Sequence, residues 1–175
     1  MNTKINENAE NDEEFQSIIK ELIENETVLK MKKYIQHCDT DCFEHCYSAS
    51  YYSYKLCKKF NLDYKSAARA AMLHDLFLYD WRVKNDREGL HAFTHPQTAC
   101  ENAEKLFKLN EKEKDIIKKH MWPVTVVPPK YKEGYILTLV DKYCALEETA
   151  KYMSKKKALK YAYVLLGGIL FKKLF

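Results

Sequence analysis

The stretch AAMLHDLFLYDW, residues 70–81, joins a run of small apolar residues to an adjacent imidazole and carboxylate, His74 and Asp75. The alanine-rich run predicts a buried helix on which other helices can converge. An ionised carboxylate in a core costs free energy unless it is paired, and a metal ion is a common partner. A helix end followed by a turn would also explain the dipeptide, so the rest of the chain must decide between these interpretations.

Length and composition restrict the fold and the class of function. The 175 residues are enough for one domain with its own core, and four glycines with four prolines favour an all-α fold over a β-sandwich. The net charge of +4 comes with dispersed lysines, which predicts no nucleic-acid surface but suits a phosphorylated small molecule. Six cysteines without a secretory signal predict reduced thiols and a cytoplasmic location.

Hydrophobic periodicity predicts helices along most of the chain, with a flexible N-terminus at residues 1–12 and the domain at residues 13–175. Asp41 and Asp63 are expected N-caps, and Pro96 is expected in the first position of a helix. The expected helices begin at Glu13, span 28–35, follow Asp41, span 64–76, begin at His95, and span 111–122, 133–148 and 155–173.

The last of these segments contains ALKYAYVLLGGILF, residues 158–171. It is too short, and too closely flanked by lysines, to span a bilayer, so no integral membrane span is expected. We interpret it as a helix that packs on the domain or on a second copy of the chain, with contact at a membrane surface as the lesser alternative.

Polar residues recur on the apolar faces of these helices. Asp141 lies among Leu137, Val140 and Cys144, which is the most informative case because a solvated aspartate would not be expected there. Each of the other inward polar residues lies on, or at the end of, a predicted helix. The candidates for one common centre are His45, His74, Asp75, His95, His120 and Asp141.

Residues 77–94 lose periodicity, and a long irregular connection of this kind is commonly functional, so we expect it to form the rim or lid of a pocket. It contains His91, an alternative to His95 as a ligand; His95 is preferred because the expected helix start would orient it inward. Arg82 and Arg87 in this loop, together with His91 and Lys142, are candidates to contact a phosphorylated substrate.

A rival site is offered by Cys38, Cys42 and Cys46, which are spaced by four residues beside His37. Such a spacing brings thiols together on a helix and would suit a thiolate metal site or a cluster. The usual C-x2-C pairs and a second group of cysteines are missing from the sequence, so ordinary, partly buried cysteines are the preferred interpretation.

The order of His45, the His74-Asp75 pair, and Asp141 resembles the HD superfamily of metal-dependent phosphohydrolases, over about residues 26–150. The resemblance implies an all-helical, single-domain bundle in which these four residues hold a metal. His95 and His120 match the subgroup with two metals, in which the aspartate of the pair, here Asp75, bridges both. One branch of this subgroup hydrolyses dinucleoside tetraphosphates and has a lysine after the last aspartate, as Lys142 follows here.

This resemblance predicts a hydrolase that cleaves a phosphate ester or phosphoanhydride of a nucleotide-like substrate, with Asp75 and Lys142 in catalytic roles. The imidazole and carboxylate ligands suit two divalent transition-metal ions, iron first, with Mn, Ni, Co or Zn as alternatives. Phe77 and Leu78 stand where the HDIG-K form of the motif has glycine and lysine, which argues against the cyclic-dinucleotide phosphodiesterase branch. A di-iron HD-type oxygenase and a non-catalytic nucleotide-sensing module remain as alternatives.

Overall fold

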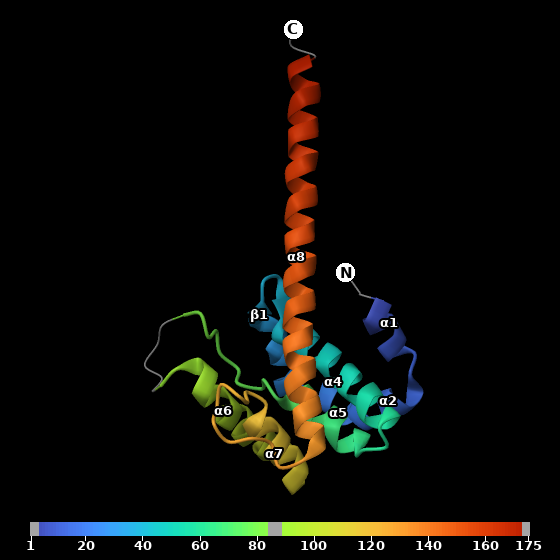
Figure 1. The fold of residues 1–175 in the computed structure, drawn as a ribbon, viewed down its shortest axis with the longest axis vertical. Helices are drawn as coiled ribbons and strands as arrows, with labels where there is room; N and C mark the ends of the chain where they lie inside the picture. The colour runs from blue at the N-terminus through green and yellow to red at the C-terminus, as the bar shows by residue number, and fades with distance from the viewer. Residues whose placement is uncertain (1–3, 84–88, 173–175) are drawn as a thin grey trace.

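The computed structural model describes the backbone of residues 4–83 and 89–172, and the side chains of residues 7–83 and 89–158. Apart from a short two-stranded hairpin, the regular structure of this part is helical, so the predicted all-α fold is confirmed (Figure 1). The elements are α1 (Lys4–Glu10), α2 (Glu13–Ile23), α3 (Glu26–Leu29), the 3₁₀ helix η1 (Lys30–Lys33), β1 (Ile35–His37), β2 (Thr40–Asp41), α4 (Cys42–Lys59), α5 (Tyr64–Leu73), α6 (His91–Leu106), α7 (Glu111–Lys119) and α8 (Lys132–Lys172).

The core lies around α4 and α5, which pack closely along one another. Helix α8 crosses α4, α7 contacts α5 and α8, and α6 packs on α7 (Figure 1). The alanines of α5 are fully buried, as expected for a helix that several others approach. Phe15, Tyr54, Met72, Ile116 and Leu137, from five different helices, are fully buried in the same core.

Helix starts follow the capping signals in the sequence. The Asp41 carboxylate accepts a hydrogen bond from the backbone N–H of Glu44 at 2.9 Å, and the Asp63 carboxylate accepts one from Ser66 at 3.1 Å. Both predicted N-caps are therefore confirmed. At the start of α7, Asn110 and Glu113 form a reciprocal capping box, which fixes the first residue of this helix. The other end of α7 lies at the candidate site.

Two predicted boundaries and the expected position of Pro96 differ in the structure for local reasons. The helix expected at 28–35 ends early, because η1 leads into extended backbone at Tyr34 and then into the hairpin. Helix α6 begins at His91, four residues before the expected start, since the Leu90 carbonyl already accepts hydrogen bonds from Phe93 and Thr94. Pro96 consequently lies inside the helix, where it lacks the N–H that would continue the hydrogen-bond ladder.

The two helices expected at 133–148 and 155–173 are joined in the single helix α8. The intervening residues TAKYMS contain no glycine or proline to interrupt it. Figure 1 shows α8 leaving the body of the molecule and continuing far beyond it. No helix in the described ranges has the length and apolar character needed to cross a membrane. Within the N-terminal segment expected to be flexible, α1 forms and Ala9 is buried.

Candidate metal centre

The six inward polar residues predicted from the sequence meet at one point in the core. His45 comes from α4, His74 and Asp75 from the end of α5, His95 from α6, His120 from the end of α7, and Asp141 from α8. His45 Nε2 lies 3.1 Å from Asp141 Oδ1, and His95 Nε2 lies 3.2 Å from Asp75 Oδ1. The structure thus assembles the predicted set from five helices, while the role of its members as ligands stays a prediction.

Backbone carbonyls orient three of the four imidazoles. The Nδ1 atoms of His74, His95 and His120 lie 2.7, 2.7 and 2.8 Å from carbonyl oxygens one helical turn earlier in the chain. A carbonyl can only accept, so each Nδ1 carries a proton, and in the neutral ring the lone pair lies on Nε2. In its neutral form each ring therefore directs Nε2, the nitrogen that can bind a metal, at the centre.

His45 is oriented instead by Glu148, a residue that the sequence interpretation missed. The Glu148 carboxylate oxygens lie 3.0 and 3.2 Å from His45 Nδ1, on the side of the ring opposite Asp141. A carboxylate that accepts this proton fixes the ring and makes the other nitrogen a better ligand. The available signal was spacing, since Glu148 follows Asp141 by two helical turns and shares its face.

The donor atoms form two groups that adjoin at His74 and Asp75. Ligand atoms of His45, His74 and Asp141 lie within 4.8 Å of one another, and so do those of His74, Asp75 and His120. Asp75 Oδ2 lies 3.4 Å from His74 Nε2, whereas its Oδ1 lies 3.2 Å from His95 Nε2 and 3.6 Å from His120 Nε2. Asp75 Oδ1 is therefore turned toward His95 and His120, and Oδ2 is turned toward His74.

Several buried donor atoms at the centre lack a hydrogen bond among the described residues or oppose one another. His74 Nε2 and Asp75 Oδ1 are buried and make no hydrogen bond within the described part of the chain. His95 Nε2 and His120 Nε2 face each other at 3.0 Å, although both carry lone pairs. Divalent metal ions would satisfy the orphaned atoms and relieve the opposed lone pairs, so the residues present fit such ions.

The electrostatics of the site are those of a cluster that holds positive charge. Burial alone would lower the pKa of His45 and His74, but the carboxylates around them, Asp141 and Glu148 for His45 and Asp75 first for His74, raise it well above its usual value, so a metal ion would replace protons of these rings. Burial alone would raise the pKa of Asp75, but the neighbouring imidazoles, His74 first, hold that pKa well below its usual range. Burial, reinforced by the charge of His74, lowers the pKa of His120 to about 3. Asp75 is thus ionised and His120 neutral near pH 7, so both are ready to coordinate a metal.

Two buried thiols lie behind this centre. Cys42 Sγ donates a hydrogen bond to the backbone carbonyl of Asp75 at 3.2 Å, and Cys46 Sγ lies 3.5 Å from His74 Nδ1. Burial raises the pKa of both thiols, so they stay protonated. Cys38 is exposed in the turn between β1 and β2, apart from these buried thiols. The cysteines therefore support the His74-Asp75 backbone and give little support to a three-thiolate site.

A cavity of about 270 Å³ opens directly onto the centre. Part of its wall consists of the candidate ligands themselves. Its remaining polar wall includes Gln36, whose amide donates to Asp75 Oδ2. The other lining side chains that bear on function are His37, Trp81, His91, Met121 and Lys142.

The predicted substrate contacts are divided by the structure. Lys142 and His91 line the cavity. His91 stacks on His95 with ring centroids 4.4 Å apart, and its Nδ1 lies 3.1 Å from the Tyr79 hydroxyl, so it packs beside the ligand set while His95 reaches Asp75. Arg82 is instead held by Asp80 through contacts of 2.9 and 2.8 Å and does not line the cavity. Arg87 lies outside the described residues.

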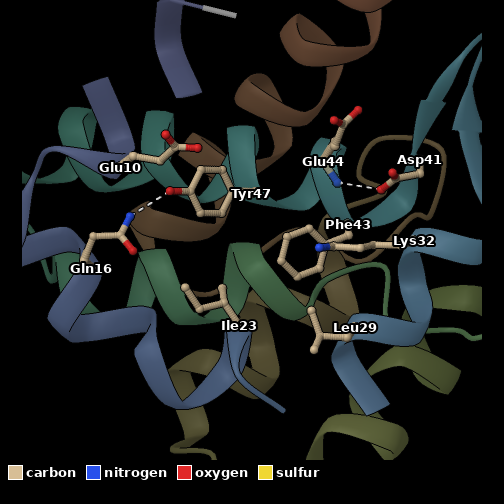
Figure 2. Close-up of a pocket in the computed structure, with 9 residues that line it drawn as sticks. All are labelled: Glu10, Gln16, Ile23, Leu29, Lys32, Asp41, Phe43, Glu44 and Tyr47. Carbon is tan, nitrogen blue, oxygen red and sulfur yellow. Dashed lines mark hydrogen bonds between the residues drawn. The ribbon is translucent and has the colours of Figure 1, made fainter. Parts of the chain in front are cut away.

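A second and larger cavity, of about 470 Å³, lies between α2, η1 and α4 (Figure 2). Its lining contains no histidine and none of the six candidate ligands. The hydrogen bonds drawn there have structural roles, from Gln16 to the Tyr47 hydroxyl and from the Glu44 backbone to the capping Asp41. This cavity is larger than the one at the candidate metal centre, but the chemistry lies in the smaller one.

The fold and the centre define an all-helical protein with buried histidine and carboxylate groups suited to divalent metals. A family model of the HD domain matches residues 42–146, and the chain belongs to that family of metal-dependent hydrolases. This confirms the resemblance to the HD superfamily, whereas membership of the two-metal subgroup stays a prediction. All six candidate ligands lie within the matched range. Searches of curated proteins and of solved structures each gave no significant match.

Proposed function

We propose that this protein is a phosphohydrolase of the HD family that cleaves a phosphate ester or phosphoanhydride of a nucleotide-like molecule. The observation that supports this most directly is the arrangement of two donor groups, with Asp75 turned toward both, beside a cavity that Lys142 also lines. A volume of about 270 Å³ is at the small end of the range for ligand sites, which suits a small phosphorylated molecule rather than a polymer.

The proposed ligands divide by position. His45, His74 and Asp141, with Asp75, would hold one divalent transition-metal ion, and Asp75 with His95 and His120 would hold a second. Iron is the first choice, and Mn, Ni, Co or Zn would also accept these donors. Two such ions, when bound, lower the pKa of a water so that it attacks near neutral pH, and they polarise the phosphoryl oxygens.

The residues of the chain have separate tasks around this centre. Lys142 supplies a positive charge at the cavity wall, and because its Nζ donates at 3.2 Å to the neutral Thr138 carbonyl, that charge remains able to attract a phosphate. Trp81 stacks on His91 with an interplanar angle of 13° and offers an aromatic surface to a nucleobase at the rim.

The proposal is tested with protein purified without chelators. Metal content is measured first, and the release of phosphate or of shorter nucleotides is then assayed over nucleotides and dinucleotides with Mn or Co, in the absence of oxygen. We expect hydrolysis products whose formation depends on the added metal. Iron-dependent oxygen consumption without hydrolysis of any of these substrates would support the di-iron oxygenase instead. Tight nucleotide binding without any product would support the sensing module.

A further inference from the structure

Helix α8 has two apolar faces, and only one of them is used by the domain. Leu137, Val140 and Cys144 are buried against the core. On the opposite side, Leu139 and Leu146 are 70% and 71% exposed. We define the α8 stripe as the exposed residues of this second face, namely Tyr135, Leu139, Tyr143, Leu146, Ala150 and Met153.

The stripe has the spacing of a helix-pairing surface. Leu139, Leu146 and Met153 are seven residues apart, so they lie on nearly the same line along the helix. The helix also runs well beyond the body of the molecule (Figure 1). Helices in proteins gain most of their stability by packing an apolar face, and a lone exposed helix lacks that contribution. This surface is therefore suited to pairing with another helix.

We propose that the α8 stripe pairs with the same stripe of a second copy, with the two helices antiparallel and the two-fold axis at Leu146. In this register Leu146 meets Leu146 of the second copy, and Leu139 meets its Met153. The pairing is self-complementary, as a two-fold interface requires. At each end, Tyr135 meets Lys157 of the second copy, which places an ammonium group beside an aromatic ring.

Charge distinguishes the antiparallel arrangement from the parallel one. Six lysines lie on the distal part of the helix, at Lys151, Lys155, Lys156, Lys157, Lys160 and Lys172, whereas residues 132–150 carry two, Lys132 and Lys142. A parallel pair would align the lysines of both copies with one another and they would repel. An antiparallel pair places the two lysine-rich segments at opposite ends of the interface instead. Lys151 and Lys155 already contact Glu147 and Asp39 at 2.8 Å in their own chain, which reduces their charge further.

The pairing would also border the cavity. Lys142 lines the cavity and lies one turn from both Leu139 and Leu146 along α8. A second helix on the stripe would therefore run beside the cavity mouth.

The test is the mass of the full-length protein in solution, measured by light scattering over a concentration series. We expect twice the chain mass of 20.7 kDa for the wild type, and a twofold fall in mass for Leu146→Glu. Phe60→Glu is the matched control, because Phe60 is 60% exposed but lies at the end of α4, and it should stay dimeric. Unchanged circular dichroism shows that each variant is folded.

Two further experiments address the register. Leu146→Lys should also be monomeric, and mixing it with Leu146→Glu should restore a dimer. In a Cys38→Ser background, Leu139→Cys chains should cross-link with Met153→Cys chains in preference to their own kind. A monomeric wild type, a dimeric Leu146→Glu variant, or cross-links mainly between identical variants would each overturn the proposal. A monomer that instead binds to lipid vesicles would overturn it in favour of a membrane surface.

Discussion

Glu148→Ala is the change that tests the candidate metal centre most sharply, because among the six candidate ligands Glu148 hydrogen-bonds to His45 in the part of the chain that the structure describes. Its carboxylate oxygens lie 3.0 and 3.2 Å from His45 Nδ1, and the residue is 9% exposed. Without this acceptor, the His45 ring can rotate or exchange its proton between nitrogens. Removing such an orienting carboxylate typically weakens metal binding by about 10- to 100-fold. That corresponds to about 1.4 to 2.7 kcal/mol.

The assay is a chelator competition that gives the metal affinity of each folded variant. Glu147→Ala is the matched control, because the neighbouring Glu147 pairs with Lys151 at 2.8 Å on the outside of α8 and should leave the affinity unchanged. Glu148→Gln retains an acceptor oxygen but loses the charge, so we expect an intermediate affinity. Wild-type metal affinity in Glu148→Ala would refute the positioning role, and an equal loss in Glu147→Ala would show that the effect is not specific to His45.

Four further predictions follow from the described contacts. Asp75→Ala should abolish binding of both metals, whereas His120→Ala should mainly remove one. Elemental analysis measures the metal content, and an Asp75→Ala protein with as much metal as the wild type would contradict the shared role of Asp75. Lys142→Met should raise KM for a phosphorylated substrate by about tenfold or more, with a smaller effect on kcat. Arg82→Ala should leave kcat/KM within about twofold of the wild type, since exposed ion pairs contribute little. The neighbours of Glu14, Lys58 first, lower the pKa of its carboxyl group to about 2. The loss of stability caused by Glu14→Gln should therefore be present above pH 4.5 and disappear as the pH falls toward 2. A difference in denaturant unfolding between the two proteins that is independent of pH would contradict this.

Most of the candidate centre could be predicted from sequence because its residues interrupt apolar helical faces. Asp141 among Leu137, Val140 and Cys144 is such a case. The hydrophobic periodicity of the sequence predicts that this helix face is buried, and the structure shows these three apolar residues buried. The N-caps Asp41 and Asp63 could also be predicted from sequence, because each side chain accepts a hydrogen bond from a backbone N–H three residues later.

What escaped prediction depends on contacts between distant segments or on competing local signals. Glu148 looks like an ordinary charged residue until α8 packs against α4 and brings it to His45. Arg82 lies near the His-Asp pair in sequence, but the adjacent Asp80 holds it on the surface. The start of α6 was misplaced because Pro96 is a strong signal for a first turn, yet the Leu90 carbonyl begins the helix earlier.

The ends of α5 and α7 have a further consequence. His74 and His120 are the C-cap residues of these helices, so two helices direct their carboxyl-terminal ends at the same point. The aligned peptide dipoles give that end of a helix a partial negative charge, which adds to the carboxylates of Asp75 and Asp141. The backbone itself therefore attracts cations and repels phosphate at this position. We expect binding to be ordered as a result, with metal required before an anionic substrate can approach.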